Sequence, residues 1–396
     1  MSAAQPAFPG RLMSIDAYRG LVLALMMGEV LHFCAVAAAR PANAVWSFLC
    51  FHQSHVEWIG GSLHDLIQPG FSFLVGVALP FSLAARRAKG QDPGQMRAHA
   101  FKRAFILVLL GIFLRSLGRP QTYFTFEDTL TQIGLGYGFL YLLGLRPRRD
   151  QWIAFAVILV VFWTAFVFYP VPPADFDWES VGVPNDWPHL MTGFQGHWDK
   201  NENLSAAFDR WFLNLYPREE LFVYNGGGYQ TLSFIPTLAT MILGLLAGGI
   251  LIGEMSARER LRWLIVAGVI GVASGWLLGA LGICPVVKRI WTPSFTLWSG
   301  GLCFLFLAGF HFVVDVRGRQ RWAFPLVVLG MNSIAAYCAD WLWTRFISEA
   351  LVRHLGPGPF LLFGTAYEPL LLGATTLLVL WLVLYWMYRR RIFLRI

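Results

Sequence analysis

Long hydrophobic runs separated by shorter polar connections dominate the chain. They cover residues 21–39, 67–85, 104–117, 130–145, 151–171, 229–253, 263–281, 293–314, 322–343 and 369–388. Most of these runs approach the roughly 20 apolar residues that an α-helix needs to cross a bilayer core. The pattern therefore predicts an all-α polytopic membrane protein with about ten transmembrane helices.

Proline and glycine positions refine individual helices. Pro69 stands just inside the second run, where the first turn of a helix tolerates its missing N–H. Pro236 lies inside the sixth run and predicts a kink there. The fourth run is short and is interrupted by Gly134, Gly136 and Gly138, which is typical of spans that line cavities.

The predicted domain organisation is simple. Neither an internal repeat nor a linker divides the chain, so we expect a single transmembrane domain over residues 1–396. Residues 1–10 contain no basic segment that leads into a cleavable apolar run, so we expect no secretory signal peptide. The longest polar connection, residues 172–228, combines tryptophans with carboxylates. That mixture suits a sugar ligand, and a folded exterior cap without a ligand is an equally open interpretation.

Composition supports the membrane assignment, and charge orients it. Of the 396 residues, 56% are hydrophobic and 14% are charged, which is too apolar for an ordinary soluble protein. Arginine clusters follow every second run, so the positive-inside rule places both termini in the cytoplasm and the long loop, residues 172–228, on the extracytoplasmic side.

The net charge of +8 is explained by these arginine clusters in the cytoplasmic loops. Because no DNA- or RNA-binding motif accompanies them, we expect no nucleic-acid partner. We expect a multi-pass protein of the bacterial inner (cytoplasmic) membrane.

The five cysteines lie within or beside apolar runs; they are Cys34, Cys50, Cys284, Cys303 and Cys338. Their spacing fits no metal-ligand pattern, so we expect no metal site. Free cysteines in such places pack like small apolar side chains, and buried free thiols are therefore the default interpretation.

Residues 55–71 concentrate ionisable and aromatic side chains at the approach to the second run. Polar groups are costly where a chain enters a membrane, so this concentration needs a physical reason. His55 suits proton transfer because its unperturbed pKa lies near physiological pH, and Asp65 is placed to orient its imidazole or to stabilise its charge. The alternative is an aqueous loop in which Trp58 is an interfacial anchor.

Ionisable residues also occur in and before the first run. Glu29 and His32 are three positions apart, and at such a depth we expect them to face the bundle interior or a wet cavity. A structural ion pair and a functional role are both open for them. Asp16 and Arg19, also three apart, are expected to share a helix face.

Several segments resemble the heparan-α-glucosaminide N-acetyltransferase family. They are residues 11–20, the His-x-x-Trp-x-Gly loop that leads into Asp-Leu-x-x-Pro at residues 55–69, Gln132-Ile-Gly134, residues 314–318, residues 330–334 and the tail at residues 388–396. These segments run through nearly the whole chain in order, which makes the resemblance more specific than any single motif.

The resemblance implies a membrane enzyme that uses cytosolic acetyl-CoA as co-substrate and acetylates an acceptor across the bilayer. Its histidine corresponds to His55, which would act as a base or as an acyl carrier. We therefore expect a transmembrane acyltransferase that delivers acetyl to an amino sugar or another saccharide on the extracytoplasmic side, by N- or O-acetylation. The expected partners are acetyl-CoA, this acceptor and the lipid bilayer, and a homodimer is left open.

The sequence also departs from the family pattern. Val30 occupies the position of an Asn in the first helix of the family, so Glu29 or His32 would have to replace it. Ile133 replaces a basic residue, and residues 224–236 lack acidic residues of the family. These departures leave the acyl acceptor less defined than the class of reaction.

The candidate site residues form three groups. Those expected in catalysis are His55, Asp65, Glu29 and His32. Those expected to bind acetyl-CoA are Arg19, Gln132, Asn332, Ser333, Arg86, Arg103 and Arg317, with Lys288 a weaker phosphate candidate because it lies in a predicted outer turn. Those expected to bind the acceptor are Trp58, Glu57, Glu127 and Asp128. For each cytoplasmic arginine, the alternative is a role in topology alone.

A transporter or permease is the alternative function. Glu29, His32, Gln132 and Asn332 would then line a polar pathway through the membrane. The sequence contains no pair of broken-helix repeats that would support it. A non-catalytic membrane scaffold is a third interpretation, and it would leave the buried polar groups unexplained.

Overall fold

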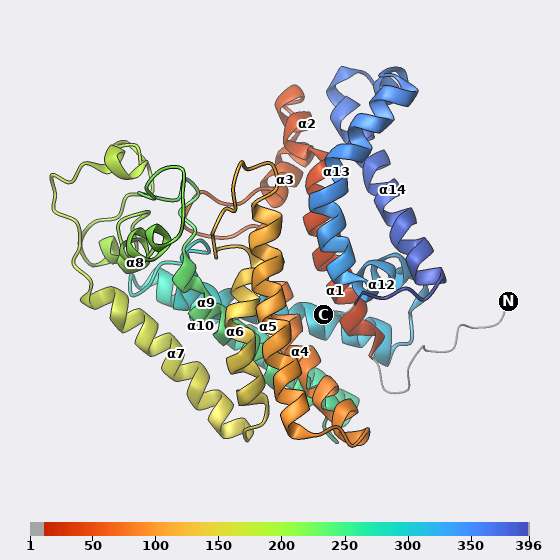
Figure 1. The fold of residues 1–396 in the computed structure, drawn as a ribbon, viewed down its shortest axis with the longest axis horizontal. Helices are drawn as coiled ribbons and strands as arrows, with labels where there is room; N and C mark the ends of the chain where they lie inside the picture. Colours follow the sequence, from red (N-terminus) through yellow and green to blue (C-terminus); the bar gives the residue numbers. More distant parts are fainter. Residues whose placement is uncertain (1–11, 395–396) are drawn as a thin grey trace. The chain divides into compact units, whose positions relative to one another are not determined.

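The computed structural model describes residues 12–394, and within this range the protein is helical, with one isolated antiparallel β-bridge between Ile59 and Val287 (Figure 1). The prediction of an all-α fold is confirmed for these residues. The predicted absence of a signal peptide concerns residues 1–10, which lie outside the described residues. So do Arg11 and the last two residues of the tail segment, 395–396.

Fourteen α-helices follow one another along the described chain. They are α1 (Met13–Met27), α2 (Phe33–Ala39), α3 (Ala44–Gln53), α4 (Ile67–Ala88), α5 (Pro93–Arg115), α6 (Thr129–Gly144), α7 (Arg148–Phe168), α8 (Leu204–Phe212), α9 (Phe234–Ile252), α10 (Ala257–Ala280), α11 (Pro293–Phe310), α12 (Phe324–Met331), α13 (Ser333–Leu355) and α14 (Glu368–Arg389). Each predicted hydrophobic run corresponds to one of these helices or to two consecutive ones.

Six helical segments of the described chain are long and apolar enough to cross a membrane, and counting two bent pairs as one span each gives up to eight. The predicted ten spans are therefore not confirmed. Two runs account for the difference. α6 has only 16 residues, and α5 begins in the polar and basic segment that precedes its apolar part.

Two predicted runs are broken in the structure. The first run bends by 42° between α1, with its short 3-10 extension, and α2; His32 stands at the break in a left-handed conformation with φ 49°. The ninth run bends by 73° between α12 and α13, where Asn332 leaves the helical region with φ −120° and ψ 42°. By contrast, Pro236 lies in the first turn of α9, where its missing N–H breaks no helical bond, so the predicted kink is wrong. Pro69 lies in the first turn of α4, as predicted.

The described chain divides into two compact units, which are considered separately. The first contains the residues up to Cys50, residues 256–265 and residues 305–394. Within it α1 packs along α12, and α14 packs against α13. Arg19 Nη1 lies 3.3 Å from Asp16 Oδ1, so these two residues share a helix face as predicted. Arg19 also donates to the carbonyl oxygen of Gly330 at 3.5 Å, which ties α1 to α12.

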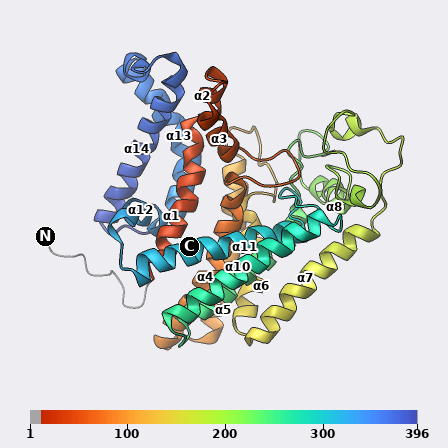
Figure 2. The same ribbon diagram turned by 180° about the vertical axis from the view of Figure 1, so that it is seen from behind.

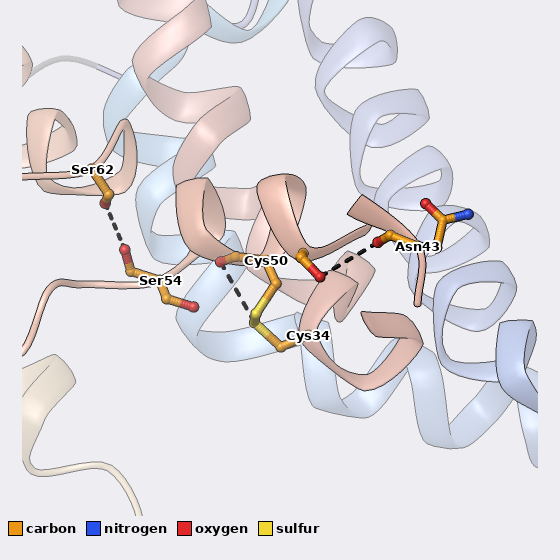
Figure 3. Close-up of a disulfide and its surroundings, with 6 residues drawn as sticks. Cys34, Asn43, Cys50, Ser54 and Ser62 are labelled. Carbon is orange, nitrogen blue, oxygen red and sulfur yellow. Dashed lines mark hydrogen bonds between the residues drawn. A yellow bond between two sulfur atoms is a disulfide. The ribbon is translucent and has the colours of Figure 1, made fainter. Parts of the chain in front are cut away.

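A disulfide joins Cys34 in α2 to Cys50 in α3 (Figure 3). The default interpretation of buried free thiols is therefore wrong for these two cysteines, because α3, a helix inside a segment expected to be a loop, brings Cys50 to Cys34. Cys284, Cys303 and Cys338 are not in a disulfide; the first two are buried and Cys338 is half-buried.

The second unit contains residues 51–255 and 266–304. Within it α4 packs along α9, α5 packs along α6, and both α6 and α7 pack against α9 (Figure 1). The α4–α9 contact is close because it is made backbone to backbone. A Cβ atom added at Gly244 of α9 would stand 1.9 Å from the carbonyl oxygen of Phe73 in α4.

Gly244→Ala should therefore destabilise the second unit. The added methyl group meets backbone rather than a movable side chain, and overpacking of this kind costs about 1–3 kcal/mol. Gly249→Ala is the matched control, because it lies in the same helix with no atom within 4 Å of the added Cβ. Thermal unfolding in detergent should show a lower Tm for Gly244→Ala than for Gly249→Ala. Equal Tm values would contradict the close packing.

The long connection, residues 172–228, folds into a cap that contains α8 and several 3-10 turns near the end of α7 (Figure 2). Trp198 of this cap is buried in an apolar cluster with Phe162 and Phe166 of α7. Asp199 is buried too; it accepts a hydrogen bond from the Met191 N–H, and burial raises its pKa to about 7. These side chains form the packed interior of the cap.

Candidate functional site

The loop that carries His55 is shaped by two glycines. Gly60 adopts φ 108°, a conformation that side-chain-bearing residues rarely take. Gly61 has no room for a side chain, since a Cβ there would lie 2.5 Å from the indole of Trp298. The Gly60 N–H donates to the carbonyl oxygen of Val286 at 2.8 Å, beside the Ile59–Val287 bridge. The glycines of the motif thus let this loop, residues 54–63, lie against the segment between α10 and α11.

Trp58 anchors this loop. Its indole is fully buried in the apolar cluster of the cap and α7, and its Nε1–H donates to the carbonyl oxygen of Trp198 at 3.0 Å. Trp58 was expected to bind the acceptor. With no exposed ring surface, it instead fixes the position of the residues on either side of it, including His55 three positions before.

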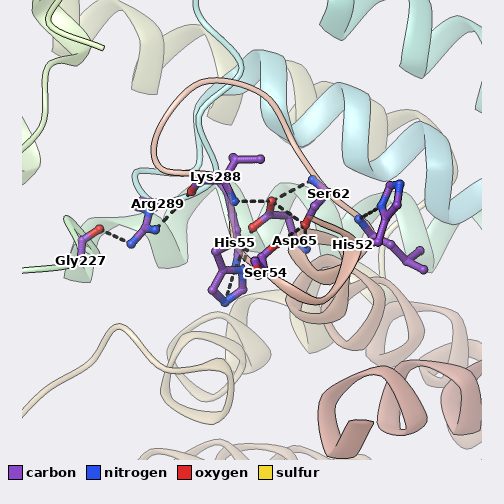
Figure 4. Close-up of polar contacts among 10 residues, drawn as sticks. His52, Ser54, His55, Ser62, Asp65, Gly227, Lys288 and Arg289 are labelled. Atoms are coloured by element: carbon purple, nitrogen blue, oxygen red, sulfur yellow. Dashed lines mark hydrogen bonds and ion pairs between the residues drawn. The ribbon is translucent and has the colours of Figure 1, made fainter. Parts of the chain in front are cut away.

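Asp65 organises the polar side of the loop. Its carboxylate is fully buried at the start of the α4 segment, where Oδ2 accepts from the Ser62 N–H at 2.9 Å and from the Val56 N–H at 3.3 Å. Oδ1 accepts from the His55 Nδ1–H at 2.8 Å (Figure 4). Asp65 therefore holds the loop backbone and the imidazole together, and its orienting role in catalysis stays a prediction.

Lys288, from the segment between α10 and α11, completes the cluster. Its Nζ lies 3.0 Å from His55 Nδ1, 3.3 Å from His55 Nε2 and 3.5 Å from Asp65 Oδ1 (Figure 4). Its side chain is only 5% exposed. The sequence indicated Lys288 only as a weak phosphate contact, because it lies in a predicted outer turn. More than 200 residues separate it from His55, so no local pattern joins the two. We call His55, Asp65 and Lys288 the histidine cluster.

The cluster keeps His55 in its neutral form. Burial lowers the pKa of His55, and the Lys288 ammonium lowers it further, while the hydrogen bond to Asp65 acts in the opposite direction. Because Nδ1–H donates to Asp65, the lone pair of the neutral ring is on Nε2. About a third of the imidazole surface remains exposed. His55 thus presents a proton acceptor at an accessible edge of the unit.

Two further histidines surround the cluster. The ring of His64 lies 4.5 Å from that of His55, centroid to centroid, and His64 is buried. His52 Nδ1 accepts a hydrogen bond from the Leu63 N–H at 3.1 Å. Both therefore support the geometry of the loop, although neither occupies the motif position of His55.

Arg289 and Tyr229 form the wall beside the cluster. Arg289 donates to the carbonyl oxygens of Gly227 and Val56, and so ties the His55 loop to the end of the cap (Figure 4). The Tyr229 ring stands edge-on to His55 at 6.3 Å, and the Lys288 Nζ lies 5.5 Å from its centroid. A half-buried aromatic ring and two cations therefore border the exposed edge of His55.

Glu57 lies on the rim of the same loop. Its side chain is 69% exposed, and its Oε2 accepts from the Trp187 Nε1–H at 3.3 Å and lies 3.6 Å from His189 Nε2. Unlike Trp58, Glu57 is accessible to a ligand.

Other predicted site residues of the second unit have structural partners. Asp128 caps α6 by accepting from the Leu130 N–H at 2.9 Å, and Glu127 lies 3.4 Å from Arg115. Burial raises the pKa of both carboxyls. Gln132 is fully buried and donates to the carbonyl oxygens of Phe126 and Thr231. The structure thus places these three at the start of α6.

The predicted acetyl-CoA residues are spread over both units. In the second, Arg86 is half-buried and donates to Gln91 at 3.0 Å, and Arg103 stacks on Tyr137 at 4.8 Å. In the first, the residues are Arg19, Arg317, Asn332 and Ser333. Asn332 is buried and donates to the Ile392 carbonyl oxygen at 2.8 Å, and Ser333 begins α13 beside it.

Glu29 and His32 also belong to the first unit, in the 3-10 turn and at the break between α1 and α2. Both are exposed. The histidine cluster therefore unites two of the four predicted catalytic residues, His55 and Asp65, and adds Lys288. Within residues 12–394 no group of three or more His, Cys, Asp or Glu side chains could hold a metal ion.

Comparison with known proteins gives two relatives that share one name. The chain is 25% identical over 370 residues to the human heparan-alpha-glucosaminide N-acetyltransferase, and 23% identical over 366 residues to the mouse protein of that name. These matches cover 84% and 83% of this chain and 53% of each relative, so the chain spans about half the length of the curated relatives it matches. No protein-family model matches. The resemblance predicted from the sequence motifs is confirmed.

Proposed function

We propose that this relative of heparan-alpha-glucosaminide N-acetyltransferase is a membrane acetyltransferase, with acetyl-CoA as donor and an amino sugar or another saccharide as acceptor. The observation that carries the proposal is the histidine cluster. A neutral, partly exposed imidazole oriented by a buried carboxylate is the arrangement that general-base catalysis requires. It lies in the loop whose motif first suggested acetyl transfer.

The chemistry asks for removal of one proton from the acceptor as it attacks the thioester. His55 Nε2 carries the lone pair that takes that proton, because Nδ1–H is engaged with Asp65. The imidazolium that forms is stabilised by the Asp65 carboxylate. His55 as an acyl carrier remains the variant mechanism; it would use the same exposed nitrogen as nucleophile.

The proposed topology places both termini in the cytoplasm and the His55 loop and the cap outside, with about ten crossings. The Cys34–Cys50 disulfide supports this orientation, because disulfides persist in oxidising compartments and Cys50 lies five positions before His55 in the sequence. Acetyl-CoA would enter from the cytoplasmic side, where Arg86, Arg103 and Arg317 are candidates for its phosphates.

Labelling of introduced cysteines tests this topology. A cysteine at Gln91, in the turn between α4 and α5, should react with an impermeant maleimide only after the cells are permeabilised. A cysteine at Glu219, exposed in the cap, should react in intact cells. Both are made in a background without the other free cysteines. Labelling of Gln91→Cys in intact cells would rule the topology out.

Purified protein with radiolabelled acetyl-CoA and glucosamine tests the reaction itself. We expect label in N-acetylated product, dependent on His55. The transporter alternative draws less support, because Gln132 and Asn332 bind backbone groups of their own chain. If label stays in acetyl-CoA with every saccharide amine and alcohol tried, the proposed function fails. Flux of an unrelated solute into proteoliposomes would then favour a transporter.

A further inference from the structure

A mechanism that uses only a base and its orienting carboxylate does not explain why Lys288 is buried beside them. An ammonium group is costly to bury, and its side chain is 5% exposed. One explanation is charge balance with Asp65. The Asp65 carboxylate, however, already accepts hydrogen bonds from His55 and from two backbone N–H groups, and its distance to Lys288 Nζ, 3.5 Å, is the longest contact of the cluster.

The two distances from Lys288 to the imidazole are more informative. Nζ lies 3.0 Å from Nδ1 and 3.3 Å from Nε2. Because these distances are similar, the ammonium lies beside the ring and not on the lone-pair axis of either nitrogen. Nε2 therefore remains open to the acceptor, with a positive charge about one hydrogen-bond length away. A carbonyl carbon attacked next to Nε2 would have its oxygen within reach of that charge.

Resting on the proposed function, we propose that Lys288 is the oxyanion-stabilising group of the reaction. Its ammonium stabilises the negative charge that develops on the carbonyl oxygen of the thioester. Fixed donors aimed at developing charge in a partly desolvated site usually provide the largest single contribution to acyl transfer. The segment between α10 and α11 holds Lys288 in place through the Ile59–Val287 bridge and the Gly60–Val286 hydrogen bond.

The step balances as follows for an amine acceptor. The acceptor nitrogen forms a bond to the acetyl carbonyl carbon, the C=O electron pair moves to oxygen beside Lys288, and His55 Nε2 takes the N–H proton. The tetrahedral intermediate then collapses: the C=O bond reforms, the C–S bond breaks, and the proton on His55 passes to the departing sulfur. The products are the N-acetylated acceptor and free CoA thiol, and an alcohol acceptor follows the same sequence.

The same ammonium influences the pH dependence of transfer. His55 acts as a base only in its neutral form, so transfer falls as pH drops through its pKa. Lys288 repels the imidazolium and so lowers that pKa. Removing the charge should raise the pKa of His55, and the acid limb of kcat against pH should move to higher pH.

Lys288→Met tests the proposal. We expect kcat to fall by roughly a hundredfold to a thousandfold, as when an oxyanion-hole donor is removed, with the KM for acetyl-CoA within about threefold of wild type. We also expect the acid limb to move upward. Lys288→Arg should recover part of kcat and return the limb toward its original pH. Lys200→Met is the matched control: that lysine is half-exposed, lies 5.4 Å over Trp187, and should keep wild-type kcat.

The outcomes separate the two proposals. If wild type transfers acetyl, His55→Ala does not, and Lys288→Met keeps kcat and its acid limb, then the role of Lys288 is overturned and the proposed function stands. A loss of thermal stability without a change in kcat also overturns that role, since it reveals a merely structural cation. If wild type itself transfers no acetyl group, both proposals fail. Should Lys288→Met not fold, Lys288→Gln retains an N–H donor and should still lose at least tenfold in kcat.

Discussion

His55→Ala should lower acetyl transfer by roughly a hundredfold to ten-thousandfold, the usual contribution of a positioned acid–base group. The protein should remain folded, because the imidazole is partly exposed and the loop is held by Trp58, Asp65 and Arg289. Acetyl-CoA should still bind, because its nucleotide end would lie on the opposite face, about 30 Å away. Transfer rate and acetyl-CoA affinity are measured on the same preparation.

The choice of control follows from the structure. His52 and His64 would be natural comparisons by sequence, but both contact the loop, so their loss is expected to disturb it. His354, exposed near the end of α13, is the better control, and His354→Ala should transfer acetyl at the wild-type rate. Near-normal transfer by His55→Ala would remove His55 from the mechanism.

Asp65→Asn should produce the second large effect, on stability as well as on rate. The Asn amide cannot accept all the hydrogen bonds that the carboxylate accepts from His55, Ser62 and Val56, and it leaves the Lys288 ammonium buried without its counter-ion. Breaking a buried ion pair in this way costs about 3–5 kcal/mol. Transfer should fall by at least a hundredfold, because the imidazole loses the partner that fixes its tautomer.

Thermal unfolding and transfer assays check this expectation together. Asp199→Asn is a suitable control, because Asp199 is also buried but burial raises its pKa to about 7, so that an uncharged side chain is tolerated. We expect its Tm to stay close to that of wild type. A Tm for Asp65→Asn equal to that of Asp199→Asn would contradict the central role given to Asp65.

Much of the architecture follows from local sequence. Apolar runs of span length become helices because a bilayer leaves their backbone groups no other partners, and this requirement is visible in the sequence alone. Pro69 takes its place in the first turn of α4 for an equally local reason. The His55–Asp65 pair was also predictable, since ten residues of one loop join them and the resemblance marked both positions.

Only the tertiary structure decided which distant groups complete the site. Lys288 reaches His55 because Gly60 and Gly61 let the loop lie against the segment before α11, and no local pattern records that meeting. The Cys34–Cys50 disulfide depends in the same way on α3.

The sequence also does not show whether a buried polar side chain has a structural or a catalytic role. Asp128 and Gln132 satisfy backbone groups around the start of α6, whereas Asp65 orients an imidazole, and their residue types alone do not distinguish these uses. Hydrogen bonds and ion pairs are contacts between atoms in space, so the partner of a buried polar group is fixed by packing and not by its neighbours in the chain.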